Sequence, residues 1–204
     1  MKIICIGRNY AAHAAELKND IPDEPVVFLK PDTARLRDGE TFYIPSFTND
    51  VHYEAELLVR INRMGKFIDE AFAHKYYNEV SVGIDFTARD VQSALKSKGL
   101  PWERAKAFDG SAGIGDWVSL EALGKPIDQL EFSLEKNGER VQHGQTSQML
   151  FDVNTLIANI SRFITLKVGD VIFTGTPAGV SSVKHADILT CHLEGRQVFQ
   201  CKVN

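Results

Sequence analysis

The apolar residues of this chain come in short runs separated by proline and glycine, and this spacing restricts the fold more than any other feature. Residues 26–29 and 42–44 form two such runs, each with proline or glycine within three residues of both ends. Short apolar runs with these boundaries are typical of strands joined by turns. Asn137-Gly138 separates two more strand-like runs, which is a strong signal for a β-hairpin. The sequence therefore predicts a fold rich in β-structure.

Helical patterns cover a smaller part of the chain. They fall in residues 8–17, 66–80, 87–98 and 152–165. The third stretch has the clearest limits, because Thr87 and Asp90 resemble a capping box with Asp in place of Glu, and Gly99 and Pro101 are stop signals. Buried strands are expected at residues 2–6, 82–86 and 171–173.

The composition indicates an ordinary globular enzyme or binding protein with a small-molecule partner. With 204 residues, 44% of them hydrophobic, the chain is long enough for one full core, and we expect a single domain over residues 1–204. A net charge of -4 without a basic stripe argues against nucleic acid or an anionic membrane as partner. No apolar run reaches the length of a signal peptide or a membrane span, and the three cysteines show no C-x-x-C spacing. These features predict a cytoplasmic protein.

Three acidic residues form the first candidate site. Glu54 and Glu56 are two apart in a strand-like segment, so their side chains project from one face. Asp85 lies among apolar residues in another expected strand, where a carboxylate needs a cationic or hydrogen-bonded partner. Oxygen ligands without cysteine or histidine suit Mg²⁺, with Mn²⁺ or Ca²⁺ as alternatives. The competing interpretation is a pair of solvent-exposed glutamates and a structural salt bridge from Asp85 to Arg89 or Lys106.

Two further groups of residues could carry chemistry. His13 and Glu16 are three apart on the first helix, where a carboxylate can orient an imidazole as a general base. Arg89 and Gln92 share one face of a later helix. Taken alone, each group is more typical of an exposed surface pair. The glycine spacing in residues 110–115 lacks the lysine of a phosphate-binding loop, and we reject it as a nucleotide site.

Six motifs in a fixed order make the chain resemble a known family. They are Gly7-Arg8-Asn9-Tyr10, Phe28-Leu29-Lys30-Pro31, His52-Tyr53-Glu54-Ala55-Glu56, the segment 85–92 with the sequence DFTARDVQ, Lys98-Gly99-Leu100-Pro101-Trp102 and Thr174-Gly175-Thr176-Pro177. Together they resemble the fumarylacetoacetate hydrolase family, in particular its short acylpyruvate hydrolase and oxaloacetate decarboxylase members. The resemblance implies an α+β, β-rich fold with a rolled mixed sheet and short flanking helices, a divalent cation and a homodimer.

The resemblance also implies roles for individual residues. Glu54, Glu56 and Asp85 would be the metal ligands, and His13 with Glu16 would be the catalytic dyad on a lid helix within residues 7–22. Lys106 would be the third catalytic residue. The substrate contacts implied are Arg8, Arg89, Gln92 and Thr176. Residues 108–113 depart from the family pattern after the lysine, which leaves the size of the substrate open.

Three functional hypotheses follow. The first is a Mg²⁺-dependent hydrolase that cleaves a carbon-carbon bond in acylpyruvates (2,4-dioxo acids) to pyruvate and a carboxylic acid, and that also decarboxylates oxaloacetate. The second is an isomerase, tautomerase or decarboxylase of 2-oxo diacids, since the same enolate chemistry serves these reactions. The third is a non-catalytic, metal-dependent metabolite-binding protein.

Overall fold

The largest sheet forms the centre of the molecule. The structure is a computed structural model that describes residues 1–16 and 20–204, and within these residues this sheet has eight strands. They are β1 (Ile3–Gly7), β2 (Val26–Lys30), β3 (Arg35–Arg37), β6 (Ala55–Ile61), β7 (Tyr77–Asp85), β9 (Ala112–Ile114), β10 (Val118–Ser119) and β13 (Val171–Phe173). Their order is β2-β1-β13-β6-β7-β9-β3, and β10 pairs with β7. The sheet is mixed, because β1 and β13 pair in parallel while β6 and β7 pair antiparallel.

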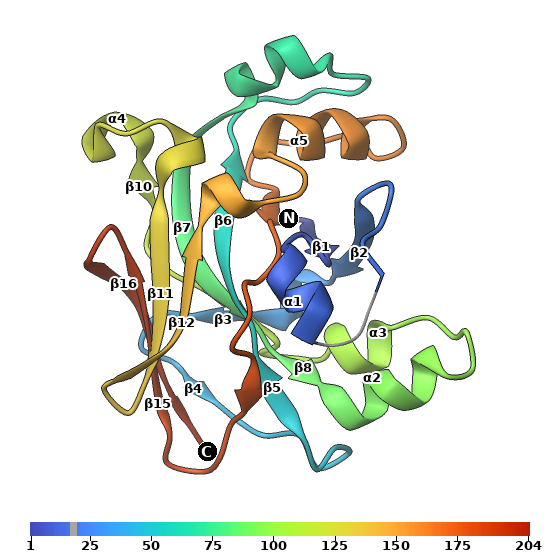
Figure 1. Ribbon diagram of the computed structural model, residues 1–204, viewed down its shortest axis with the longest axis vertical. Coiled ribbons are helices and arrows are strands. Elements are labelled where there is room, and N and C mark those ends of the chain that lie inside the picture. Colours follow the sequence, from blue (N-terminus) through green and yellow to red (C-terminus); the bar gives the residue numbers. More distant parts are fainter. Residues whose placement is uncertain (17–19) are drawn as a thin grey trace.

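Two smaller sheets complete the β-structure. The first contains β4 (Thr41–Phe42), β11 (Glu131–Lys136), β12 (Glu139–Gln145), β15 (Ile188–Leu193) and β16 (Arg196–Val203), in the order β12-β11-β15-β16-β4. The second contains β5 (Val51–Tyr53), β8 (Thr87–Ala88) and β14 (Ser181–Ser182), in the order β14-β5-β8. Figure 1 shows the strands strongly curved around the central β6 and β7.

Short helices flank these sheets. The α-helices are α1 (Ala11–Glu16), α2 (Arg89–Lys96), α3 (Glu103–Lys106), α4 (Leu120–Leu123) and α5 (Val153–Ser161), and the 3₁₀ turns are η1 (Asp32–Ala34), η2 (Glu70–Tyr76), η3 (Ile127–Gln129) and η4 (Thr146–Gln148). In Figure 1, α2 and α3 lie together beside β8, and α5 lies against η2. The predicted α+β class with a rolled mixed sheet is therefore confirmed.

Strand β6 runs through the core rather than over it. All its residues except Arg60 are buried, on both faces of the strand. Its register with β7 places Leu57 opposite Val82, and both side chains are fully buried. Such a strand has no solvent-exposed face on which an acidic residue would cost little free energy.

None of the helices in the described part of the chain is long and apolar enough to cross a membrane.

Two local predictions are wrong. The sequence predicts a helix over residues 66–80, but the one helical element in this range is the 3₁₀ turn η2, and β7 starts at Tyr77. Tyr77 pairs with Ile61 of β6, so the sheet overrides the local helix propensity. The capping box is also absent: Thr87 belongs to β8, and the N-cap of α2 is Ala88 without a side-chain cap.

Other local predictions are confirmed. Asn137 and Gly138 have φ values of 55° and 83°, as a two-residue hairpin turn requires, and they join β11 to β12. The first helix is present as α1, and it starts at Ala11 rather than at residue 8. The predicted helix residue Leu17 and part of the proposed lid fall in residues 17–19, outside the described residues.

Candidate metal centre

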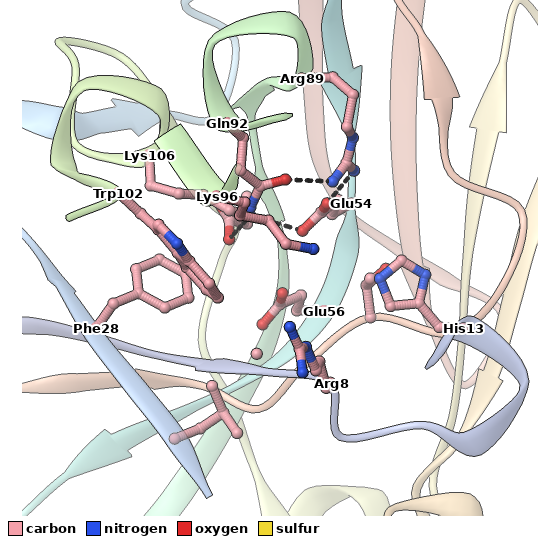
Figure 2. A pocket seen from close by; sticks show the side chains of 14 residues that line it. Arg8, His13, Phe28, Glu54, Glu56, Arg89, Gln92, Lys96, Trp102 and Lys106 are labelled. Carbon is pink, nitrogen blue, oxygen red and sulfur yellow. Dashed lines mark hydrogen bonds and ion pairs between the residues drawn. The ribbon is translucent and has the colours of Figure 1, made fainter. Parts of the chain in front are cut away.

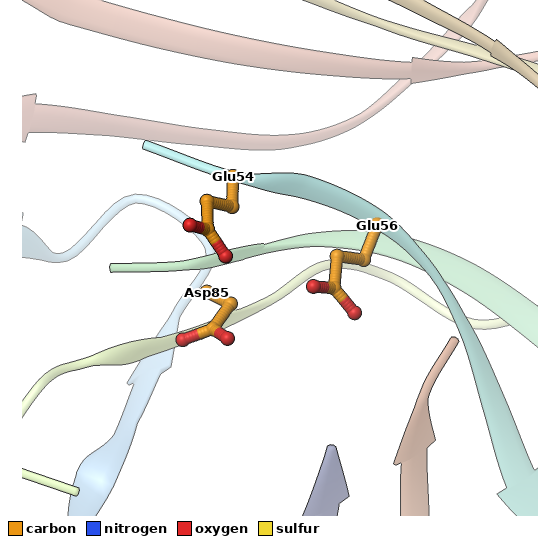
Figure 3. A group of neighbouring side chains, drawn as sticks. All are labelled: Glu54, Glu56 and Asp85. Atoms are coloured by element: carbon orange, nitrogen blue, oxygen red, sulfur yellow. The ribbon is translucent and has the colours of Figure 1, made fainter. Parts of the chain in front are cut away.

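Glu54, Glu56 and Asp85 converge at one point in the core (Figure 3). Each offers a carboxylate oxygen, and these oxygens lie within 4.8 Å of one another. Glu56 comes from β6, Asp85 is the last residue of β7, and Glu54 lies between β5 and β6. The backbone N–H of Asp85 donates to the carbonyl of Glu54 at 2.8 Å, which holds the two residues side by side. All three are at most 5% exposed, so the expectation of a solvent-exposed pair is wrong.

Lys106 is the cation that contacts two acids of this triad. From the end of α3, its Nζ lies 2.8 Å from Oε2 of Glu54 and 2.7 Å from Oδ2 of Asp85, and it also donates to the Thr87 hydroxyl at 2.6 Å. Although burial alone would lower the pKa of Lys106, the carboxylates of Asp85 and Glu54 raise it. The ammonium is therefore charged at neutral pH and lies beside the triad.

Lys30 is a second buried lysine that contacts an acid of the triad, and no role was predicted for it from the sequence. Its Nζ lies 2.7 Å from Oδ1 of Asp85 and donates to the carbonyl and hydroxyl of Ser111 at 3.1 and 3.0 Å, as well as to the carbonyl of Lys106. The lysine thus fixes both a candidate ligand and the backbone of the neighbouring lysine. Its place in the motif Phe28-Leu29-Lys30-Pro31 was the only available signal.

The first turn of α2 supplies the polar groups next to Glu54. Arg89 forms an ion pair with Glu54, and its second amino group donates to Oε1 of Gln92 at 2.7 Å. Burial would raise the pKa of Glu54, but Lys106 and then Arg89 hold it well below its usual range. The salt-bridge alternative is therefore correct in part, since Asp85 pairs with Lys106, while Arg89 pairs with Glu54 instead.

His13 and Glu16 form a pair at one side of the pocket. Nδ1 of His13 lies 3.3 Å from Oε2 of Glu16. The imidazole is buried while Glu16 is exposed, so the interpretation as a solvated surface pair is wrong for His13 and correct for Glu16. Glu16 also accepts hydrogen bonds from the Gly179 N–H at 3.1 and 3.3 Å, which tie α1 to the loop after β13. Figure 2 shows the His13 ring on the side of the pocket opposite Phe28 and Trp102.

Nine of the ten predicted site residues line one pocket. The tenth, Glu16, does not line the pocket but contacts His13, which does. The predicted residues in the lining are Arg8, His13, Glu54, Glu56, Asp85, Arg89, Gln92, Lys106 and Thr176. The Thr176 hydroxyl accepts a hydrogen bond from Gln142 at 2.9 Å. The lining residues that sequence reasoning missed are Ile6, Gly7, Phe28, Lys96 and Trp102. Phe28 and Trp102 pack edge to face, 5.9 Å between ring centroids, and form the apolar wall.

The donor set fits a divalent cation. The ion pairs described above reach Glu54 and Asp85, whereas Oε2 of Glu56 accepts from the backbone N–H of Gly175 at 2.7 Å. Gly175 has a φ of 100°, a conformation that favours glycine. Burial, and then the charges of Asp85 and Glu54, raise the pKa of Glu56 well above its usual range. A cation among the three oxygens would offset this repulsion, and the all-oxygen donor set suits Mg²⁺, Mn²⁺ or Ca²⁺.

Comparison with known proteins gives a consistent result. The chain is 41% identical to a human mitochondrial oxaloacetate tautomerase over 98% of its own length and 90% of that protein. It is 40% identical to a mitochondrial oxaloacetate decarboxylase of Dictyostelium discoideum, over 95% of this chain and 89% of the relative. The crystal structure of a fumarylpyruvate hydrolase from Pseudomonas aeruginosa, in complex with Mn²⁺ and pyruvate, superposes with a TM-score of 0.93 at 35% identity, over 100% of this chain and 89% of that one.

A family model described as fumarylacetoacetate (FAA) hydrolase C-terminal matches residues 2–204. The match includes every residue of the acidic triad and of the pocket around it. The chain therefore belongs to the fumarylacetoacetate hydrolase family.

Proposed function

We propose that this protein is a divalent-metal-dependent enzyme that converts short 2-oxo acids through their enol form, and that tautomerisation and decarboxylation of oxaloacetate are its main reactions. The observation that carries the proposal is the position of Lys106, a buried ammonium within 2.8 Å of two acids of the triad. The named activities of the human and Dictyostelium relatives support the choice of oxaloacetate.

The roles of the residues follow from their chemistry. A divalent cation held by Glu54, Glu56 and Asp85 would polarise the 2-oxo group of a substrate whose carboxylate and ketone oxygens face the triad. Lys106 would stabilise the negative charge that develops on the 2-oxo oxygen. Mg²⁺ is the proposed cation, and Mn²⁺, which the Pseudomonas structure holds, is the alternative.

His13 would move the proton in the tautomerisation. Its Nδ1 faces Glu16, so Nε2 is left to take a proton from C3 of the keto form. The 2-oxo oxygen then takes a proton from the imidazolium or from water to give the enol, and the reverse transfers restore the ketone. In decarboxylation the bond from C3 to the C4 carboxylate breaks instead, CO₂ leaves, and the electron pair passes to the 2-oxo group. That step needs no base.

Hydrolysis of acylpyruvates is the second candidate, and the His13–Glu16 pair favours it. The same imidazole could deprotonate a water that attacks the distal carbonyl, after which the carbon-carbon bond breaks to give pyruvate and a carboxylic acid. The fumarylpyruvate hydrolase among the similar structures supports this reaction class. A single domain, a homodimer and a lid formed by residues 7–22 stay predictions.

One assay separates these candidates. Enol-to-keto conversion of oxaloacetate is followed by ultraviolet absorbance, and pyruvate release from oxaloacetate and from acetylpyruvate is measured in parallel, each with Mg²⁺. We expect oxaloacetate to react and Lys106→Met to lower its turnover by about 10²-fold or more. Turnover of acetylpyruvate alone would favour the hydrolase, and binding of both compounds without turnover would leave only the metabolite-binding protein.

A further inference from the structure

The side chain of His52 lies in the same row as two acids of the triad. Strand β5 faces β8 in the same register in which β6 faces β7, so the two strand pairs form one continuous ladder. Along such a ladder, alternate residues point to one side. The row on this side consists of Asp50, His52, Glu54 and Glu56. His52 is thus the neighbour of Glu54 on the side away from Glu56.

Arg89 lies diagonally across this ladder from His52. The backbone N–H of Arg89 donates to the carbonyl of Asp50 at 2.7 Å, which places Arg89 two residues away from the position opposite His52. Diagonal side chains of this kind reach each other when one of them is long. The two amino groups of Arg89 contact Glu54 and Gln92 (Figure 2). The remaining donor, Nε, is buried and has no hydrogen-bond partner among the described residues.

The imidazole of His52 has an unused acceptor. Its Nε2 lies 3.0 Å from Oδ1 of Asp50. Because a carboxylate accepts hydrogen bonds, the ring hydrogen belongs on Nε2, and Nδ1 keeps a lone pair. Nδ1 is buried and has no hydrogen-bond partner within the described part of the chain, although the side chain as a whole is 19% exposed. Burial, and then the positive charge of Arg89, lower the pKa of His52, in keeping with a neutral ring beside the guanidinium.

A buried donor and a buried acceptor on neighbouring side chains each cost free energy when they stay unpaired. We propose that Nδ1 of His52 accepts the Nε–H of Arg89, directly or through one water, and that His52 is a positioning residue which holds the guanidinium against Glu54. Held in this way, Arg89 contacts Oε1 of Glu54, while Oε2 faces Lys106. The expected effect on metal binding rests on the proposed function, in which the triad holds a divalent cation.

Nuclear magnetic resonance of the wild type without metal or substrate gives the first test. The ¹⁵N spectrum of the His52 ring should show a hydrogen on Nε2 and none on Nδ1. The Nε–H signal of Arg89, identified by its loss in Arg89→Lys, should exchange slowly with water. A hydrogen on Nδ1 of His52, or an Arg89 Nε–H that exchanges as fast as those of exposed arginines, would overturn the proposal. This measurement does not depend on the folding of a His52 variant.

Two substitutions separate the contact with Arg89 from the contact with Asp50. The amide oxygen of asparagine lies near the position of Nδ1, whereas the longer glutamine places its amide near the position of Nε2. His52→Asn should keep the exchange rate of the Arg89 Nε–H within about threefold of the wild type, and His52→Gln should raise it by about tenfold or more. If the two variants have equal exchange rates, Nδ1 is not the partner of Arg89 and the positioning role is wrong.

Calorimetric titration with Mn²⁺ measures the consequence for the triad. Because groups behind the metal ligands tune the affinity, His52→Gln should weaken Mn²⁺ binding by about fivefold or more, and His52→Asn by less than about twofold. In an Arg89→Lys background, which lacks the Nε–H, His52→Gln should have no further effect. The control is His74→Gln, which removes an exposed histidine outside the pocket and should leave the affinity unchanged. An equal loss in both backgrounds, or no loss in either, would contradict the positioning role.

Turnover of oxaloacetate by the wild type is measured separately, so the two proposals can fail independently. A protein whose Mn²⁺ affinity depends on His52 as described, but which turns over no 2-oxo acid, refutes the proposed activity and supports the positioning role. A protein that turns over oxaloacetate, but whose Arg89 Nε–H exchanges at the same rate in His52→Gln as in the wild type, supports the activity and refutes the positioning role.

Discussion

The ammonium of Lys30 lies 2.7 Å from Oδ1 of Asp85, in a part of the core where both side chains are at most 1% exposed. The other oxygen of the same carboxylate faces Lys106, also at 2.7 Å. Asp85 is thus held between two buried cations, and its orientation toward Glu54 and Glu56 depends on both.

Replacement of Lys30 by methionine should destabilise the protein strongly. The change keeps most of the side-chain volume but leaves Asp85 with one cation fewer and the Ser111 carbonyl with the Phe86 N–H in place of two donors. We expect the free energy of unfolding to fall by about 3 kcal/mol, the scale of a broken buried ion pair. Urea unfolding measures it. The control is Lys2→Met, which removes the partly exposed ion pair with Asp170 and should cost less than about 1 kcal/mol. Equal costs for the two variants would mean that Lys30 has no special structural role.

Replacement of Glu56 by glutamine should have opposite effects with and without metal. Since burial and the neighbouring carboxylates already disfavour the charge of Glu56, the metal-free variant should melt at a higher temperature than the wild type at pH 7. With Mn²⁺ the order should reverse, because the affinity for the cation falls by at least about tenfold. Calorimetric titration and thermal melts measure the two effects. Unchanged Mn²⁺ affinity would exclude Glu56 as a ligand.

Much of the site could be predicted from the sequence because its residues lie in compact motifs. Glu54 and Glu56 are two apart, Arg89 and Gln92 are three apart, and each spacing determines a shared face. Lys30 could not be assigned in this way, because its role depends on contacts with residues 55 and 81 positions further along the chain. The sequence predicts Thr87 as part of a helix cap, but its hydroxyl accepts a hydrogen bond from Lys106 and donates one to the carbonyl of Asp85.

In the fold, too, elements set by neighbouring residues could be predicted from the sequence, whereas elements set by distant contacts could not. The hairpin at Asn137-Gly138 follows from the turn residues themselves. The segment before Tyr77 has a helix-favouring composition, yet it is a 3₁₀ turn that leads into a strand paired with β6, a contact no local pattern reveals.

Replacement of His13 by alanine should separate the two reaction classes. Hydrolysis of acetylpyruvate needs an activated water and should fall by about 10² to 10⁴-fold, whereas decarboxylation of oxaloacetate needs no base and should change less than about tenfold. Initial rates of pyruvate release from both compounds measure this. The reading of His13 as the base is wrong if acetylpyruvate hydrolysis, where present, is unaffected.

Asp90 should make the attachment of α2 sensitive to acid. Its carboxylate accepts hydrogen bonds from the Thr48 hydroxyl at 2.5 Å and from the Asn49 and Val91 N–H groups at 2.9 and 2.8 Å. Burial acts to raise the pKa of Asp90, but these hydrogen bonds outweigh it and lower the pKa. Its contribution to stability is therefore present above the unfolded pKa of about 3.9 and is lost as the pH falls through the lower folded value.

The variant Asp90→Asn tests this pH dependence. An amide in place of one oxygen faces the Asn49 N–H with a second donor, so the variant should melt below the wild type at pH 6 to 7. The difference should shrink as the pH approaches 3. Thermal melts across this range measure it, and a constant difference would show that the charge of Asp90 has no part in it.

The central claim is that the acidic triad holds a divalent cation without which 2-oxo acids do not react. The direct measurement is the rate of oxaloacetate conversion by protein stripped with a chelator, then by the same protein with Mg²⁺ or Mn²⁺ restored. The rate of a blank that contains the same cation and no protein is subtracted, because free cations polarise oxaloacetate in solution, and Glu56→Gln is measured under identical conditions. We predict that the enzymatic rate disappears on chelation, returns with the metal, and stays at background in Glu56→Gln. A rate that survives chelation, or that equals the wild-type rate in Glu56→Gln, would contradict the account.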